Sequence, residues 1–96
     1  MRVTRRDHSG YPTLDVAGAL VGRHWLSFVG ELRAVIAEGT DSIGVDLSKV
    51  TRMGQAEAQF LMDMRDRMAR HHRVLTLVGL SPASINAISH ACVARF

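Results

Sequence analysis

The sequence predicts an α/β fold with a four-stranded mixed β-sheet, an N-terminal β-hairpin and helices packed on the sheet. Short segments with a strand pattern alternate with longer segments of helical period, which favours parallel strands joined by right-handed crossovers. The first two strand segments are instead separated only by a short turn at residues 8–10, as in a hairpin. With 96 residues and no linker or repeat, the chain fits a single domain over residues 1–96.

The N-terminal hairpin is predicted from two short strands. Residues 3–6 carry charges that suit an edge of the sheet. Residues 11–16 form the second strand, with Pro12 near its start, where a proline is tolerated. Gly18 is then expected to end this strand.

The first helix is predicted over residues 22–38, because apolar residues recur there every three or four positions. The predicted buried stripe consists of Trp25, Val29, Leu32 and Ile36, widened by Phe28 and Val35. Gly39 follows directly and is suited to cap the C-terminus of this helix.

The middle of the chain repeats the alternation of strand and helix. Residues 42–47 form a strand, since Ile43, Val45 and Leu47 alternate onto one face. Residues 55–71 form the second helix, whose predicted buried stripe consists of Phe60, Leu61, Met64 and Met68.

The last strand and helix complete the predicted fold. Residues 74–78 form the most apolar strand, which is therefore expected inside the sheet. Ser81 is a suitable N-cap and Pro82 a suitable first residue for a short third helix. The residues expected to face inward from this helix are Ile85, Ile88 and Cys92.

Composition and charge exclude several classes of partner. The formal net charge is +3, but the arginines are scattered and many have acidic neighbours, so no nucleic-acid partner is predicted. The N-terminus has no apolar signal segment, and no apolar run reaches the length that spans a bilayer. We therefore expect a cytoplasmic protein without direct membrane insertion.

No catalytic site, metal or cofactor is predicted. The five histidines lie in separate elements or, like His71 and His72, are adjacent and point in different directions on a helix. The serines have no sequence-visible base or glycine elbow, and no glycine-rich phosphate loop is present. The chain is therefore expected not to be an enzyme.

Three blocks of the sequence resemble STAS domains, the fold of anti-sigma-factor antagonists. Residues 45–51, Val-Asp-Leu-Ser-Lys-Val-Thr, resemble the third strand of that family and the loop after it. Residues 18–20, Gly-Ala-Leu, resemble its turn before the first helix, and residues 74–82 resemble its fourth strand and the turn into the last helix. The order and spacing of these blocks extend the resemblance over nearly the whole chain, which implies a STAS-like bacterial regulator.

The loop before the second helix departs from the family pattern. In the family this loop reads Asp-Ser-Ser-Gly or Asp-Ser-Thr-Gly, and a kinase anti-sigma factor phosphorylates its second hydroxyl residue. The matching residues here are Gly54, Gln55, Ala56 and Glu57. Ala56 stands at the phosphosite-equivalent position and has no oxygen for a phosphoryl group, so the chain is expected to be non-phosphorylatable there. Glu57 either holds the loop permanently on or off by its fixed charge, or is only a favourable first-turn residue.

The resemblance implies a partner-binding loop at residues 53–57, which are Met53, Gly54, Gln55, Ala56 and Glu57. Supporting contacts are expected from Asp46, Trp25 and Gln59. Asp46 could bind a cation or, in the favoured interpretation, accept hydrogen bonds from the loop backbone. Trp25 would contact a partner if it is partly exposed, although core packing is its favoured role.

Two functional hypotheses follow from the resemblance. In the first, the chain resembles an anti-sigma-factor antagonist: a non-catalytic regulatory module that binds an anti-sigma factor or kinase-like regulator, without a phospho-switch. In the alternative, it resembles the cytoplasmic STAS subunit that binds the ATPase of a lipid-asymmetry ABC transporter, a role that needs no kinase. The sequence leaves open the partner, the direction of regulation, the oligomeric state and any weak nucleotide binding.

Overall fold

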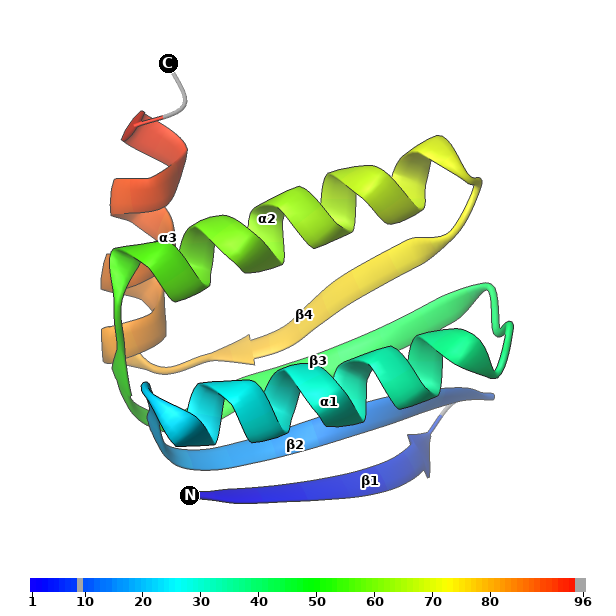
Figure 1. Ribbon diagram of the computed structural model, residues 1–96, viewed down its shortest axis with the longest axis horizontal. Coiled ribbons are helices and arrows are strands. Elements are labelled where there is room, and N and C mark those ends of the chain that lie inside the picture. The colour runs from blue at the N-terminus through cyan, green and yellow to red at the C-terminus, as the bar shows by residue number, and fades with distance from the viewer. Residues whose placement is uncertain (9, 95–96) are drawn as a thin grey trace.

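A computed structural model describes residues 1–8 and 10–94, apart from the side chains of His8 and of residues 92–94. Strands and helices follow one another in the predicted order (Figure 1). In chain order the elements are β1 (Arg2–His8), β2 (Tyr11–Leu20), α1 (Arg23–Ala37), β3 (Ser42–Met53), α2 (Gln55–Arg70), β4 (Val74–Leu80) and α3 (Pro82–Ala94).

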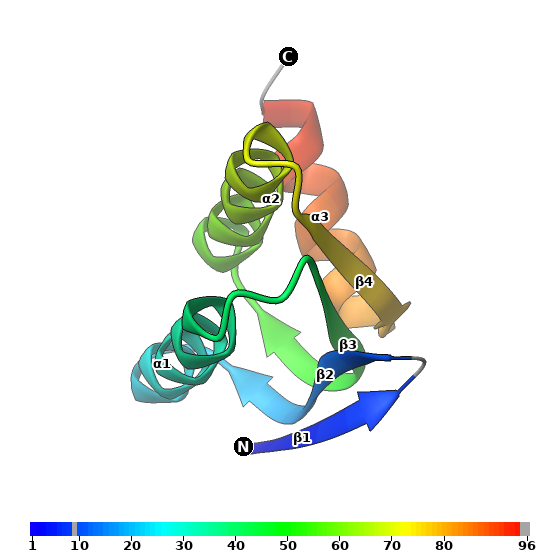
Figure 2. The ribbon, with the colours of Figure 1, turned by 90° about the vertical axis from the view of Figure 1, so that its right-hand side faces the viewer.

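The four strands form one mixed sheet in the order β1-β2-β3-β4. β1 pairs with β2 in antiparallel fashion, whereas the β2–β3 and β3–β4 pairs are parallel. Each parallel crossover carries one helix, and α1 and α2 lie on the same side of the sheet (Figures 1 and 2). α3 packs beside α2 and against β3. The predicted fold class, a hairpin leading into a parallel α/β unit, is confirmed.

The position of β4 differs from the prediction, because this strand is an edge of the sheet and does not lie inside it. The apolar side chains of β4 lie on both faces of the strand, and only one face is buried. Leu75 faces the helices and is buried, while Val74 and Val78 remain 53% and 44% exposed on the strand. Within the described part of the chain, no further strand pairs with β4 on its outer side. The apolar content of the strand therefore predicted more burial than the structure shows.

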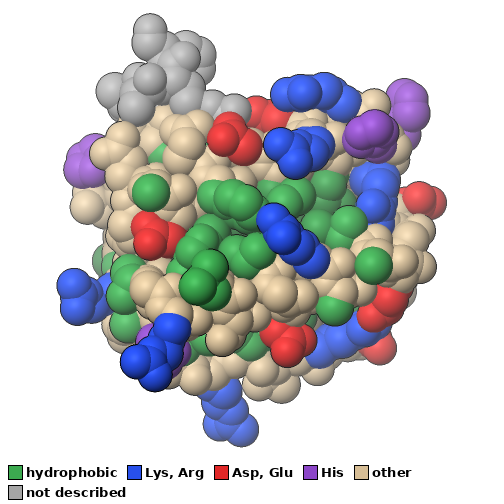
Figure 3. Space-filling view, in the orientation of Figure 1, with side chains coloured by type: hydrophobic (Ala, Val, Ile, Leu, Met, Phe, Trp, Pro, Cys, Tyr) green, Lys and Arg blue, Asp and Glu red, His purple; other side chains and the backbone are tan. Residues whose placement is uncertain are grey.

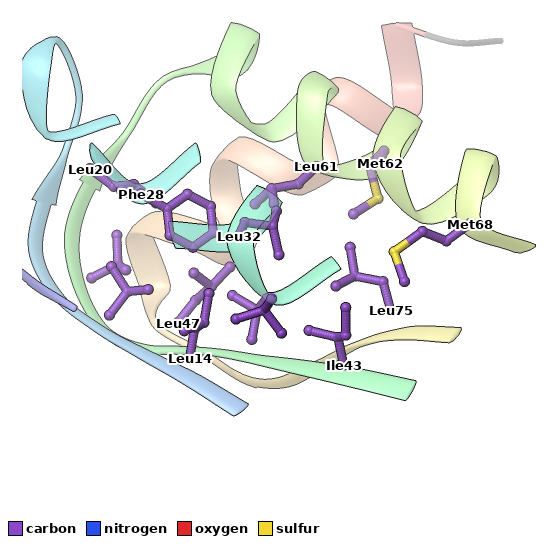
Figure 4. Close-up of a cluster of buried hydrophobic side chains, with 14 residues drawn as sticks. Leu14, Leu20, Phe28, Leu32, Ile43, Leu47, Leu61, Met62, Met68 and Leu75 are labelled. Atoms are coloured by element: carbon purple, nitrogen blue, oxygen red, sulfur yellow. The ribbon is translucent and has the colours of Figure 1, made fainter. Parts of the chain in front are cut away.

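The core lies between the sheet and the two helices α1 and α2 (Figure 4). From α1 it takes Phe28, Leu32 and Val35, so the buried stripe is centred one position away from the predicted one. Trp25 and Ile36 are only partly buried and pack at its margin. The remaining fully buried large side chains come mainly from the strands and α2, and include Leu14, Leu20, Ile43, Leu47, Leu61 and Met62.

The buried face of α2 agrees with the prediction at Leu61 and Met68 but differs at the other two positions. Ala58, Leu61, Met62 and Met68 are buried, whereas Phe60 and Met64 are only half-buried. Apolar side chains remain visible at the surface between α1 and α2, because these two helices stand apart over the sheet (Figure 3).

β2 and β3 are both longer than predicted. β2 continues through Gly18, which has a φ of 101°, and its pairing with β3 shifts register on either side of that residue. β3 continues through the polar residues Ser48 and Lys49 to Met53. Asp46 therefore lies within β3 instead of at its end.

The start of α3 agrees with its predicted caps. The Ser81 Oγ accepts a hydrogen bond from the Ser84 backbone N–H at 3.1 Å, which satisfies one of the free donors of the first turn. The predicted inward position of Ile85 is wrong, since this residue is 49% exposed. Small residues, Ser84, Ala87 and Ala91, are buried instead, because α3 approaches its neighbours closely. The prediction for the Cys92 side chain lies outside the described residues.

Candidate functional site

Three helices begin at one edge of the sheet. β2, β3 and β4 are parallel to one another, so their carboxyl ends, at Leu20, Met53 and Leu80, meet at the same edge. α1, α2 and α3 each start within three residues of these ends (Figure 1). In open α/β sheets this edge is the usual place for a binding site.

The predicted partner-binding loop lies at this edge. Gly54 is the N-cap of α2 and has an extended backbone, with φ −85° and ψ 165°. No side chain caps the helix there, so backbone N–H groups of its first turn remain available to a partner or to water. Gln55 and Ala56 are exposed, while Met53 and Glu57 are half-buried. The loop therefore combines an accessible tip with anchored flanks.

Glu57 lies in the first turn of α2 and folds back toward the loop. Its Oε2 occupies the space in which a side chain at Gly54 would begin. A carboxylate in this position interacts favourably with the positive end of the helix dipole. The fixed charge of Glu57 is therefore directed at its own helix terminus, and a larger residue at position 54 would displace it.

A small pocket of about 260 Å³ adjoins the loop. Its walls come from all three strand ends: Val21 after β2, Arg52, Met53 and Gly54 at the end of β3, and Ala83 and Asn86 in the first turns of α3. Sequence reasoning missed four of these residues. Their common signal is a position next to the carboxyl end of a parallel strand, which the strand order alone could have revealed.

Trp25 lies near the start of α1 and connects this helix to α2. Its ring packs against Phe28, with centroids 5.5 Å apart, and edge-on against Phe60 of α2, with centroids 5.3 Å apart. The side chain is half-buried, so Trp25 combines core packing with a partly accessible surface. Gln59 is also half-buried, and its Nε2 donates a hydrogen bond to Asp63 Oδ1 at 3.2 Å.

Asp46 lies on the opposite face of the sheet from the buried Val45 and Leu47, apart from the loop at residues 53–57. Its Oδ1 accepts a hydrogen bond from the Ser48 backbone N–H at 2.9 Å, and its Oδ2 lies 3.3 Å from Arg6 Nη2. Hydrogen bonding by Ser48, followed by the charges of Arg6 and Lys49, lowers the pKa of Asp46. The backbone donor is thus in Asp46's own strand, not in the loop.

The described residues form no metal site and no membrane-spanning helix. Among them, no three His, Cys, Asp or Glu side chains come together in a way that could hold a metal ion. None of the helices in that part of the chain is both long enough and apolar enough to cross a membrane.

Comparison with known proteins supports the resemblance seen in the sequence. A family model described as "Mlab, STAS domain" matches residues 3–93. No curated protein matches the chain by sequence. The fold is similar to the crystal structure of an anti-sigma factor antagonist from Mycobacterium paratuberculosis, with a TM-score of 0.82 and 19% sequence identity over 98% of this chain and 80% of that one. At this identity the similarity shows a shared fold.

Proposed function

The chain belongs to the STAS domain family, and we propose that it is a non-catalytic regulatory module that binds another protein. The contact surface that we propose consists of the loop at residues 53–57 and the adjoining pocket. We refer to this combination as the α2 entry surface. The observation that carries the proposal is the meeting of three helix starts and a pocket around an exposed loop.

The α2 entry surface suits a protein partner better than a small substrate. The pocket of about 260 Å³ is below the usual size of a small-molecule site, and it contains one charged side chain, that of Arg52. Exposed Ala56 and the apolar wall formed by Val21, Met53 and Ala83 can be covered by a partner. The charges of Arg52 and Glu57 at its margin would be paired by the partner or stay in water. These residues lie at the ends of strands and in the first turns of helices, not in long loops. Binding therefore costs little conformational entropy of the chain.

Binding is proposed to work without a phospho-switch in the loop. None of the five residues 53–57 carries a hydroxyl group, so no phosphate ester can form on them. Ala56 presents a methyl group at the exposed second position of α2. Control would then have to come from the amounts of the two partners, or from a change in the partner itself.

The partner we propose first is an anti-sigma factor or a kinase-like regulator, in the cytoplasm of a bacterium. The fold shared with an anti-sigma factor antagonist supports this choice. The ATPase of an ABC transporter is the other candidate, because that partnership also needs a docking surface and no kinase. Identification of the captured protein distinguishes the two.

Affinity capture with matched variants tests the proposal. The wild-type chain, Ala56→Glu and Ala34→Glu are each immobilised and exposed to a lysate of the source organism. Ala56→Glu introduces a charge into the centre of the α2 entry surface, and an acidic residue in the first turn of a helix does not destabilise it. Ala34 is exposed on α1, away from the strand ends, and serves as the control.

We expect one protein to be retained by the wild-type chain and by Ala34→Glu but lost with Ala56→Glu. A protein retained equally by all three would show that the α2 entry surface is not the contact. If a protein is captured by Ala34→Glu but not by the wild type, or by neither of these two chains, the claim of a specific partner would be contradicted.

A further inference from the structure

A pocket lies on the other side of the sheet from α1 and α2. It has a volume of about 460 Å³ and is bounded by β1, β2 and β3. Three cationic and two acidic side chains line it, which leaves a formal charge of +1; they are Arg2, Arg6, Lys49, Asp15 and Asp46. This volume is within the range of small-molecule sites.

Strand register arranges these side chains in two neighbouring rows. In one row, Thr4 pairs with Asp15, and Asp15 pairs with Asp46. In the next, Arg2 pairs with Ala17, and Ala17 pairs with Lys49. Strands are about 4.8 Å apart, so the backbones at Arg2 and Lys49 are separated by two strand spacings, about 10 Å. The small side chain of Ala17 leaves the space between them open.

The two carboxylates of the first row are already engaged by one arginine. Arg6 Nε lies 2.8 Å from Asp15 Oδ2, and Arg6 Nη2 lies 3.3 Å from Asp46 Oδ2. Asp46 also accepts the Ser48 N–H. By contrast, the side chains of Arg2 and Lys49 form no ion pair or hydrogen bond within the part of the chain that is described.

We infer that this pocket binds a small molecule carrying a phosphomonoester, held between Arg2 and Lys49 over Ala17. A phosphomonoester carries a charge of about −1.5 to −2 at neutral pH. Arg2 and Lys49 supply two positive charges for it, and Lys49 acts on Asp46 only through its field, without a direct ion pair. The Arg2 guanidinium can donate two parallel hydrogen bonds to phosphate oxygens, and the Lys49 ammonium supplies a point charge. Thr4 adds an exposed hydroxyl donor in the neighbouring row.

The site is independent of the α2 entry surface. Its charged residues lie in the strands and face away from α1 and α2, whereas the proposed protein contact lies at the carboxyl ends of the strands. Either site can therefore exist without the other, and each is tested by its own variants.

A titration followed by two-dimensional ¹H–¹⁵N NMR tests the inference. Glycerol 3-phosphate is added to the uniformly labelled chain at constant ionic strength, with sodium chloride as the balancing salt. We expect saturable shifts centred on the amides of Ala17 and Lys49. Lys49→Gln should weaken binding about fivefold, the effect of losing one solvent-screened charge contact. Arg70→Gln, at an exposed position near the end of α2, should leave the affinity unchanged.

Asp15→Asn should strengthen binding instead of weakening it. An unfolded variant could not produce this result. The substitution removes a negative charge from the pocket wall and releases Arg6 from one of its two carboxylates. Binding of glycerol 3-phosphate should become about threefold tighter. Shifts that do not saturate, or affinities that are equal in the wild type, Lys49→Gln and Asp15→Asn, would overturn the inference.

The same phosphomonoester can come from a free metabolite or from a lipid headgroup. Sedimentation with phosphatidylcholine vesicles that contain phosphatidic acid examines the second source. Saturable binding to glycerol 3-phosphate with no cosedimentation assigns a soluble ligand. Cosedimentation that Lys49→Gln reduces assigns a lipid phosphate, and cosedimentation that Lys49→Gln and Arg70→Gln reduce equally would contradict a role for this pocket at membranes.

Discussion

The ring of Trp25 in α1 packs edge-on against the ring of Phe60 in α2, with centroids 5.3 Å apart and an interplanar angle of 89°. This contact joins the N-terminal part of α1 to the first half of α2, two helices that otherwise stand apart over the sheet (Figures 1 and 2). Because Gln55 begins α2 only five residues before Phe60, the pair also helps to fix the α2 entry surface.

A double-mutant cycle with Trp25→Ala and Phe60→Ala measures this contact. Edge-to-face aromatic pairs contribute about 0.5–1.5 kcal/mol beyond the area that they bury. We expect a coupling free energy of that size in urea denaturation, in addition to the cost of each single substitution. Strict additivity of the two single effects would show that the rings do not interact in solution.

Gly44 allows close packing on the helix-free face of the sheet. A Cβ atom at this position would lie 2.7 Å from Thr13 Oγ1 and 3.0 Å from Val78 Cγ2. We expect Gly44→Ala to lower the free energy of unfolding by about 1–3 kcal/mol through overpacking. Urea denaturation followed by circular dichroism measures the change.

Gly30→Ala is the matched control for this substitution. Gly30 lies within α1, and a Cβ atom there would have no neighbour within 4 Å. Alanine should therefore raise the free energy of unfolding by about 0.5–1 kcal/mol through its higher helix propensity. The same sign of effect at both glycines would contradict the packing described around Gly44.

Arg73, between α2 and β4, ties this part of the chain to the end of α1. Its Nη2 donates hydrogen bonds to the carbonyl oxygens of Ile36 and Thr40, at 2.9 and 2.7 Å, and its Nε also donates to Thr40 at 3.0 Å. We expect Arg73→Lys to destabilise the domain by about 1–3 kcal/mol, because an ammonium cannot reproduce the guanidinium fork. A thermal melt compares it with Arg70→Lys, whose side chain is exposed. Equal melting temperatures for the two variants would contradict this role.

The carboxylate of Asp46 should contribute to the stability of the fold in a pH-dependent way. Its folded-state pKa is lowered by hydrogen bonding to Ser48 and by the charge of Arg6, so the carboxylate stabilises the fold above the unfolded-state value of about 3.9. This contribution is lost as the pH falls through the folded-state pKa. Asp46→Asn should therefore be less stable than the wild type at pH 7, and the difference should shrink below about pH 4. A difference that stays constant with pH would contradict the assignment.

The helices were predicted well because each has a long apolar period and a clear start or stop. α1 and α2 agree with the predicted ranges to within one residue at each end, and Gly39, with a φ of 83°, follows α1 as expected. The carboxyl ends of β2, β3 and β4 were not predicted, since polar residues such as Ser48 and Lys49 can continue a strand when neighbouring strands satisfy its backbone.

Burial was harder to predict than secondary structure. Val74 and Ile85 are apolar but exposed, because β4 is an edge strand and α3 uses small residues for its close contacts. The order of the neighbouring blocks predicted a partner-binding loop at residues 53–57, and its binding role stays a prediction. The pocket beside it was not predicted, because Val21 and Asn86 come from distant parts of the sequence and meet only through the strand order.

Calorimetric titration of the purified partner tests the central claim most directly, with the chain prepared without phosphorylation. The account predicts that the wild-type chain and Ala34→Glu bind with equal affinity, and that Ala56→Glu binds about tenfold or more weakly while keeping its melting temperature. Equal affinity for all three chains would contradict the claim that the start of α2 is the contact surface.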